Sequence, residues 1–232
     1  MKHEVVSREA WQVARAALLA EEKELTHARD RLCAARRALP WVKLEKSYVF
    51  EGPEGKVTLA GLFEGRSQLV VKHFMMGPGQ THHCVGCSFE VDHITPALVH
   101  LENHDVSYAV VARARIGEIE AYKKRMGWRF RWVSSFGSDF NYDFGVSFRE
   151  GPLEDGSGNS VFYRNPEGEI FHTYSAFGRG AEEVLTTYMV LDLTPKGRNE
   201  PERGNLTDWV RPHDRYGKHG RVDEYGRYHA EG

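Results

Sequence analysis

The chain has 232 residues, of which 41% are hydrophobic and 28% are charged, and its formal net charge is −2. This composition predicts an ordinary globular protein, and the small net charge gives no reason to expect nucleic acid or an anionic membrane as a partner. No apolar run approaches the roughly 20 residues needed to cross a bilayer, and the first residues lack a signal-peptide pattern. A cytoplasmic protein is therefore predicted.

A long helix is predicted over residues 7–39, as an N-terminal extension formed by residues 1–40. Ser7 is a suitable N-cap and Pro40 ends the pattern. Apolar side chains recur every seven residues along it, at Trp11, Leu18, Leu25 and Leu32. This narrow apolar seam either joins two copies in a homodimer or packs on the chain's own domain.

Beyond residue 40 the pattern changes to short strands and helices, which predict a second domain over residues 41–194. The predicted strands are residues 42–50, 56–59, 68–76, 107–114, 129–136, 161–163 and 170–174. The predicted helices are residues 89–104, kinked at Pro96, then 116–126 and 181–193. This order predicts an α/β fold with a mixed sheet and helices on both faces. Residues 195–232 are polar, which predicts a C-terminal tail that is disordered or wrapped on a neighbouring molecule.

The most informative motif is Cys84-Val85-Gly86-Cys87, between a predicted strand and a predicted helix. Thiols at positions i and i+3 of a helix can form a disulfide, and a helix N-terminus stabilises a thiolate. The motif therefore predicts thiol–disulfide chemistry, in which Cys84 attacks and Cys87 resolves the mixed disulfide. His83 is expected to assist as an imidazolium. The third cysteine, Cys33, is expected to be a small buried hydrophobe beside the seam.

A metal site is the second interpretation of this region. Thiolate and imidazole ligands of the zinc or copper type fall within twelve residues, at His82, His83, Cys84, Cys87 and His93. A structural zinc site normally needs a second, distant ligand pair, and no second C-x-x-C pattern exists. The redox interpretation is favoured, and it requires no dissociable cofactor.

Further candidate residues follow two predicted strands. The aromatic-rich loop at residues 134–145 contains Asp139 and Tyr142, and loops at the carboxyl ends of strands often bind ligands. An aromatic loop with local backbone hydrogen bonds is the other possibility. His172, Tyr174 and Arg179 follow the last strand, where they either face the cysteines or are ordinary edge residues.

Several segments resemble a bacterial thioredoxin-like family, domain-of-unknown-function family 899. They are residues 37–42, 68–71, 120–128, 137–145 and 171–175, with Arg179 and Gly180. The resemblance covers nearly all of residues 3–200, and it implies a thioredoxin-like fold of the peroxiredoxin branch. Peroxiredoxins carry a Thr three residues before the peroxidatic Cys, and Thr81 has that offset from Cys84. A later Arg orients the peroxide, which suggests Arg179 or Arg164.

The predicted function is that of a thiol-based redox protein, a thiol–disulfide oxidoreductase acting through Cys84 and Cys87. Its substrate would be a protein or small-molecule thiol or peroxide. A peroxiredoxin-like peroxide reductase, a zinc- or copper-binding protein and a non-catalytic thioredoxin-fold protein are the alternatives. A non-catalytic protein would use the helix at residues 7–39 as its interaction surface.

Overall fold

The computed structural model describes residues 3–151, 153–200 and 208–230. The chain divides into two compact units, Met1–Pro40 and Trp41–Gly232. Among the described residues, none of the helices combines the length and the apolar character needed to cross a membrane.

The first unit is built on a single long helix, α1 (Arg8–Arg37). The Ser7 side chain accepts a hydrogen bond from the Ala10 N–H at 3.2 Å, so the predicted N-cap is confirmed. Every residue of α1 is exposed or half-buried, and the apolar seam at Trp11, Leu18, Leu25 and Leu32 is exposed. Cys33 is half-buried. The homodimer through this seam stays a prediction.

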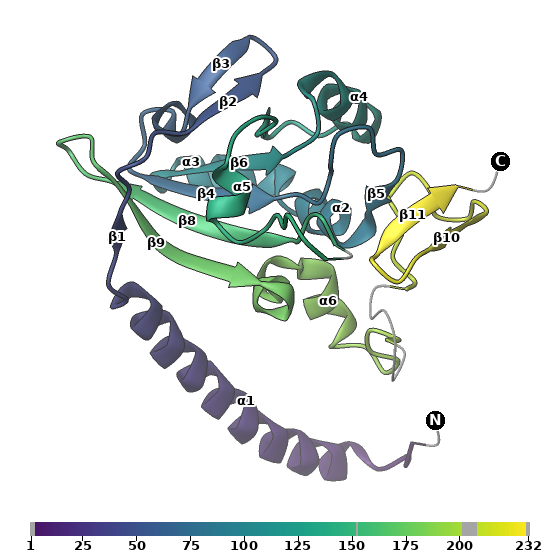
Figure 1. Ribbon diagram of the computed structural model, residues 1–232. Helices are drawn as coiled ribbons and strands as arrows, with labels where there is room; N and C mark the ends of the chain where they lie inside the picture. The colour runs from purple at the N-terminus through teal and green to yellow at the C-terminus, as the bar shows by residue number, and fades with distance from the viewer. Residues whose placement is uncertain (1–2, 152, 201–207, 231–232) are drawn as a thin grey trace. The chain divides into compact units, whose positions relative to one another are not determined.

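The second unit contains an eight-stranded mixed sheet in the order β1-β9-β8-β4-β6-β7-β2-β3 (Figure 1). The strands are β1 (Val42–Lys43), β2 (Val49–Gly52), β3 (Gly55–Thr58), β4 (Gln68–His73), β6 (Val106–Ala112), β7 (Arg131–Ser134), β8 (Gly158–Arg164) and β9 (Ile170–Phe177). The three strands β4, β6 and β7 are parallel neighbours, and the β8–β9 hairpin pairs antiparallel with β4. This arrangement confirms the predicted α/β fold with a mixed sheet.

Helices cover both faces of this sheet, because side chains alternate between its faces along each strand. Tyr108, Val110 and Ala112 of β6 join a core with α2 (Val85–Asp92) and α4 (Ile116–Met126). Ala109 and Val111 join a second core with η1 (Ala60–Phe63) and α5 (Phe140–Asp143). We call these the α2 face and the α5 face of the sheet.

Several predicted elements differ from the observed ones. Residues 42–50 are not one strand, since β1 pairs with β9 and β2 pairs with β7. The predicted helix at 89–104 is divided into α2, η2 (Thr95–Ala97) and α3 (Leu98–Glu102), and Pro96 lies in the short η2 turn. The loop at 134–145 contains α5, and the closing helix is η3 (Gly178–Val184) followed by α6 (Thr186–Leu191).

The C-terminal tail folds back on its own domain, so the prediction of a disordered or partner-wrapped tail is wrong for its described part. β10 (Gly220–Val222) and β11 (Arg227–Ala230) form a hairpin. β11 pairs with the short strand β5 (His83–Cys84), and Figure 1 shows the yellow β10–β11 hairpin beside the blue β5. Residues 201–207 and 231–232 of the predicted tail lie outside the described residues.

Candidate active site

The two thiols lie in the first turn of α2, as the motif predicts. Cys84 is the N-cap residue, and its Sγ accepts a hydrogen bond from the Cys87 N–H at 3.3 Å. The Cys84 side chain therefore takes the position that Ser, Thr or Asp usually occupies at a helix start. Both thiols are free, and they are buried, with 6% of Cys84 and 1% of Cys87 exposed.

A buried ion pair lies beside the thiols on the α2 face of the sheet. Lys72 of β4 is fully buried and forms a very short ion pair with Glu90 of α2. The Lys72 Nζ also donates to Ser157 Oγ at 2.7 Å, and Asn159 Nδ2 donates to Glu90 Oε1 at 2.8 Å. Buried charges persist when they are paired and hydrogen-bonded in this way.

The surroundings give the two thiols different acidities. The hydrogen bond from the Cys84 thiol to Cys87, together with burial, raises the pKa of Cys84 well above its ordinary value. Burial also opposes ionisation of Cys87. There the hydrogen bond from Cys84, the positive charge of Lys72 and the Met75 N–H, 3.5 Å from Sγ, outweigh burial and lower the pKa to about 6. The resting thiolate is thus favoured on Cys87.

His83 has a different environment from the one that its predicted role requires. Its ring stacks on Tyr122 with 3.6 Å between ring centroids. Burial, and then the charge of Arg125, lower the pKa of His83 to about 4, so the ring is neutral near pH 7. An imidazolium at His83 is therefore not supported. The Tyr122 hydroxyl shares a 2.9 Å hydrogen bond with Ser88 Oγ, which in turn donates to the Cys84 carbonyl oxygen.

The predicted alternative metal ligands do not converge. His93 Nε2 lies 2.6 Å from Thr187 Oγ1, while His82 packs beside His229, with 5.2 Å between the ring centroids. Within residues 3–151, 153–200 and 208–230, no three His, Cys, Asp or Glu side chains are grouped as they would be to hold a metal ion.

The predicted substrate-binding residues belong to separate clusters. Asp139 pairs with Lys46 at 3.0 Å, and the Tyr142 hydroxyl accepts from Arg113 at 3.2 Å. Arg179 is paired with Glu182 on η3 at 2.9 Å. Thr81 is exposed in the loop before β5, and Arg164 is half-buried at the end of β8. In the described chain, hydrogen bonds to the two sulfurs come from Met75 and from within the Cys84–Cys87 turn, and not from these residues.

His172 lies on the opposite face of the sheet from the thiols. Its ring packs on Phe144 and Phe162 of the α5 face, with centroid distances of 5.2 and 5.6 Å. Its Nε2 lies 2.8 Å from Ser175 Oγ and 3.0 Å from the carbonyl oxygen of Tyr174. His172 and the cysteines are therefore separated by the sheet.

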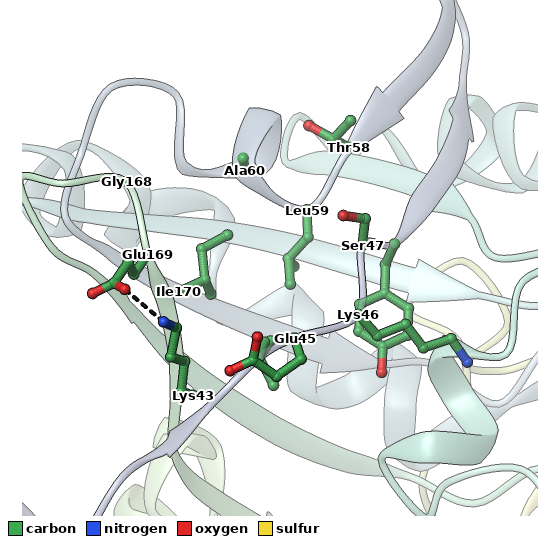
Figure 2. A pocket seen from close by; sticks show the side chains of 12 residues that line it. Lys43, Glu45, Lys46, Ser47, Thr58, Leu59, Ala60, Gly168, Glu169 and Ile170 are labelled. Carbon is green, nitrogen blue, oxygen red and sulfur yellow. Dashed lines mark hydrogen bonds and ion pairs between the residues drawn. The ribbon is translucent and has the colours of Figure 1, made fainter.

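The molecule also has a cavity of about 380 Å³ between the segment after β1, the end of β3 and the turn before β9. Figure 2 shows Lys43 and Glu169 joined by an ion pair of 2.6 Å at its side, with Leu59 and Ile170 among the lining side chains. Neither cysteine lines it. The two thiols and this cavity therefore lie at separate places in the second unit.

A family model described as "Bacterial protein of unknown function (DUF899)" matches residues 1–216. The chain belongs to this family. No curated protein shows detectable similarity to it.

Solved peroxiredoxin structures are similar to this DUF899 protein at low identity. PrxQ of Xylella fastidiosa is 16% identical, with a TM-score of 0.44 over 63% of this chain and 89% of that chain. Peroxidoxin BcpB of Mycobacterium tuberculosis is 11% identical, with a TM-score of 0.48 over 66% and 97%. A peroxiredoxin-like protein of Aquifex aeolicus is 15% identical, with a TM-score of 0.44 over 60% and 80%.

Sequence reasoning missed Lys72 and Glu90 in this DUF899 protein. One signal was present, because Lys72 stands inside an apolar run that reads as a buried strand, where an unpaired lysine would be costly. Glu90 is three residues after Cys87 and so shares its helix face. Nothing in the sequence states that these two positions meet.

Proposed function

We propose that this DUF899 protein is a thiol-based redox protein in which Cys84 and Cys87 alternate between a dithiol and a disulfide. The carrying observation is the buried Lys72 ammonium, whose charge favours a thiolate on Cys87 inside an apolar core. A pair of cysteines that only fills space has no need of a buried cation, and burial alone keeps thiols protonated.

The proposed reaction begins with Cys84, the more exposed of the two cysteine residues. Cys84 passes its proton along the hydrogen bond to Cys87 and attacks one sulfur of a substrate disulfide. The substrate S–S bond breaks, and the first substrate thiolate leaves with a proton. Cys87 then loses its proton and attacks Cys84, which breaks the mixed disulfide and releases the second thiol. Two electrons pass to the substrate, with one proton from the pair and one from solvent.

Reduction of a hydroperoxide is the second candidate, and the burial of both sulfurs favours it, because a small oxidant needs less access than a protein does. The Cys84 thiolate would attack the terminal peroxide oxygen, the O–O bond would break, and the alkoxide would take the proton held by Cys87. Attack of the Cys87 thiolate on the resulting sulfenic acid would form the disulfide and expel hydroxide, which becomes water. A low-molecular-weight thiol would then restore the dithiol.

The decisive experiment is alkylation mass spectrometry of native protein equilibrated in a glutathione redox series. We expect Cys84 and Cys87 to change state together as one two-electron couple, at a potential of roughly −120 to −270 mV. A pair that stays reduced across the whole series would overturn the proposal. Cys33→Ser protein is the matched control, because it retains the couple and removes the third thiol.

The two candidates are separated with Cys87→Ser protein, which lacks the resolving thiol. If the substrate is a hydroperoxide, this variant accumulates a sulfenic acid on Cys84 that a dimedone probe labels. If it is a disulfide, the variant accumulates a mixed disulfide on Cys84 instead. Cys84→Ser protein should give neither product, and full activity of Cys84→Ser would exclude Cys84 as the attacking thiol.

A further inference from the structure

We propose that residues 208–230 form a strap over the Cys84–Cys87 site. While the strap is bound there, it excludes protein-sized substrates and admits only low-molecular-weight oxidants. This inference rests on the proposed function, since it concerns access to the same two sulfurs. The family match ends at residue 216, so β10 and β11 lie beyond it.

The strap pairs with the segment that carries the first thiol. In the β5–β11 ladder Arg227 lies opposite Cys84, and Tyr228 lies opposite His83. The Val85 N–H, at the start of α2, donates to the Gly226 carbonyl oxygen at 2.8 Å. The edge of β5, which an extended substrate segment would otherwise pair with, is occupied by the chain's own C-terminal strand.

Apolar side chains fix the strap on α2. Val210 is fully buried, and Tyr228 is 6% exposed. Both belong to a small core that includes Val85 and Phe89 of α2. The Tyr228 hydroxyl donates to the His219 carbonyl oxygen at 2.9 Å, which closes the hairpin region on itself. The first helical residue after Cys84 is thus packed directly under the strap.

Charged contacts hold the strap at a second place. Asp214 accepts two hydrogen bonds from Arg125 of α4, both of 2.8 Å. His213 Nδ1 lies 2.8 Å from Asp92 Oδ1. These groups are partly exposed, so their interactions are weaker and more dependent on salt than the apolar contacts are. Such contacts can break locally while the sheet core stays folded.

The docked strap has a consequence for the kind of substrate. A specific protein–protein contact covers about 800 Å² on each partner. A protein disulfide would need much of the surface around Cys84, and β11 occupies one side of it. A small disulfide or hydroperoxide needs only a narrow path to one sulfur. Release of residues 208–230 would then admit larger partners, so the strap sets size selectivity.

The test compares a small and a large thiol reagent on the full-length protein. N-ethylmaleimide and a long polyethylene-glycol maleimide are applied to reduced native protein, and the rate at each cysteine is read by peptide mass spectrometry. Cys33 of α1 is the internal reference, because it lies in the other unit of the chain. We expect the large-to-small rate ratio at Cys84 to be at least about tenfold below that at Cys33.

A release variant and a matched control complete the design. Asp214→Lys combined with Tyr228→Ala replaces the ion pair with a like charge and removes the buried ring, and hydrogen–deuterium exchange of residues 208–230 verifies release. The rate ratio at Cys84 should then rise about tenfold. Glu224→Lys, which places a lysine at an exposed strap position, should leave the ratio unchanged.

Two results would overturn the proposal that residues 208–230 restrict access to Cys84. One is equal ratios at Cys84 and Cys33 in the native protein, and the other is a released strap with an unchanged ratio at Cys84. Alkylation requires free thiols only, so these outcomes do not depend on the redox potential of the pair. Conversely, a pair that stays reduced in the glutathione series would reject the redox proposal and leave the measured access unaffected.

Discussion

Lys72 and His73 are neighbours on β4 and both are fully buried, but the Lys72 side chain is charged and the His73 side chain is neutral. Lys72 points to the α2 face, where Glu90 and the thiols are. Burial opposes its charge, but Glu90 and Cys87 outweigh burial and raise the pKa of Lys72. His73 packs on Phe140 of the α5 face, where burial and the nearby charge of Lys72 lower its pKa to about 3.

The difference between the two pKa shifts comes from the groups that contact each side chain and not from how deeply each side chain is buried. The neighbours of His73 are hydroxyls and rings, with Ser160 Oγ at 2.9 Å and Phe140 stacked at 5.5 Å between centroids. Ser160 continues to Ser175, which connects to His172, and none of these contacts supplies a negative charge. A buried base keeps its proton where a carboxylate contacts it, and loses it where no carboxylate does. The α2 face therefore retains a cation beside the cysteines.

The largest expected effect is on the α2 face. Lys72→Met leaves the buried carboxylate of Glu90 without its cation, which should cost about 3–5 kcal/mol of unfolding free energy. It should also raise the pKa of Cys87, because the charge that favours its thiolate is removed. Urea unfolding measures the first effect, and the pH dependence of ultraviolet thiolate absorbance measures the second.

The double variant Lys72→Met/Glu90→Gln separates stability from chemistry. It removes both charges and keeps an acceptor for Asn159 Nδ2, so most of the stability should return. The pKa of Cys87 should stay raised, since the cation is still missing. An unchanged Cys87 pKa in both variants would show that Lys72 does not set its acidity.

The next effect concerns His73 on the α5 face. Its folded pKa, about 3, lies below the unfolded value of about 6.5, so the unfolded chain binds the proton first. The stability that depends on neutral His73 is therefore complete above pH ~6.5 and is lost as the pH falls toward the folded pKa. Between pH 6.5 and 5, the unfolding free energy of the native protein should fall by about 1.5 kcal/mol more than that of His73→Phe protein.

Urea unfolding of both proteins across this pH range gives, for each, the slope of unfolding free energy against pH. His83 contributes in the same direction, because its pKa is also lowered, to about 4. His83→Gln protein is thus the control that keeps His73 and removes the other buried imidazole. Identical slopes for native and His73→Phe protein would mean that His73 is not held neutral.

The smallest effect is expected at an ammonium outside the core. Lys46 lies 3.0 Å from Asp139 and 2.7 Å from Asp143, but half of its side chain is exposed. Solvent screens these pairs, so Lys46→Ala should leave the urea midpoint unchanged within error. A loss of unfolding free energy comparable to that of Lys72→Met would show that the number of contacts, and not burial, determines how much an ion pair stabilises this protein.

Much of the fold was accessible from the sequence. The apolar runs around β4 and β6 predicted strands, and α4 has the bounds that its pattern gave. The pairing partners of short segments were not accessible. Val42 and Val49 were placed in one strand, whereas β1 joins β9 and β2 joins β7, because edge pairing depends on distant parts of the chain.

The features of the candidate site also divide into those that the sequence could predict and those that it could not. The spacing of Cys84 and Cys87 and their position at a helix start were readable, since they depend on a single turn of chain. The separation of His172 from the cysteines was not, because a two-residue period shows that faces alternate but not which face carries the thiols. The fold of residues 208–230 was also missed, because polar composition hides the few residues, such as Val210 and Tyr228, that anchor them.

The sequence by itself therefore determined the local facts of this protein: a strand, a thiol pair one helical turn apart, and alternating strands that form a mixed sheet. Only the tertiary structure decided that Lys72 meets Glu90 beside Cys87, that His73 is held neutral one residue away, and that β11 lies along β5. Local geometry follows from the backbone periods of helix and strand, whereas these contacts join residues 18 to more than 100 positions apart. Their energies arise only when packing removes water from both partners.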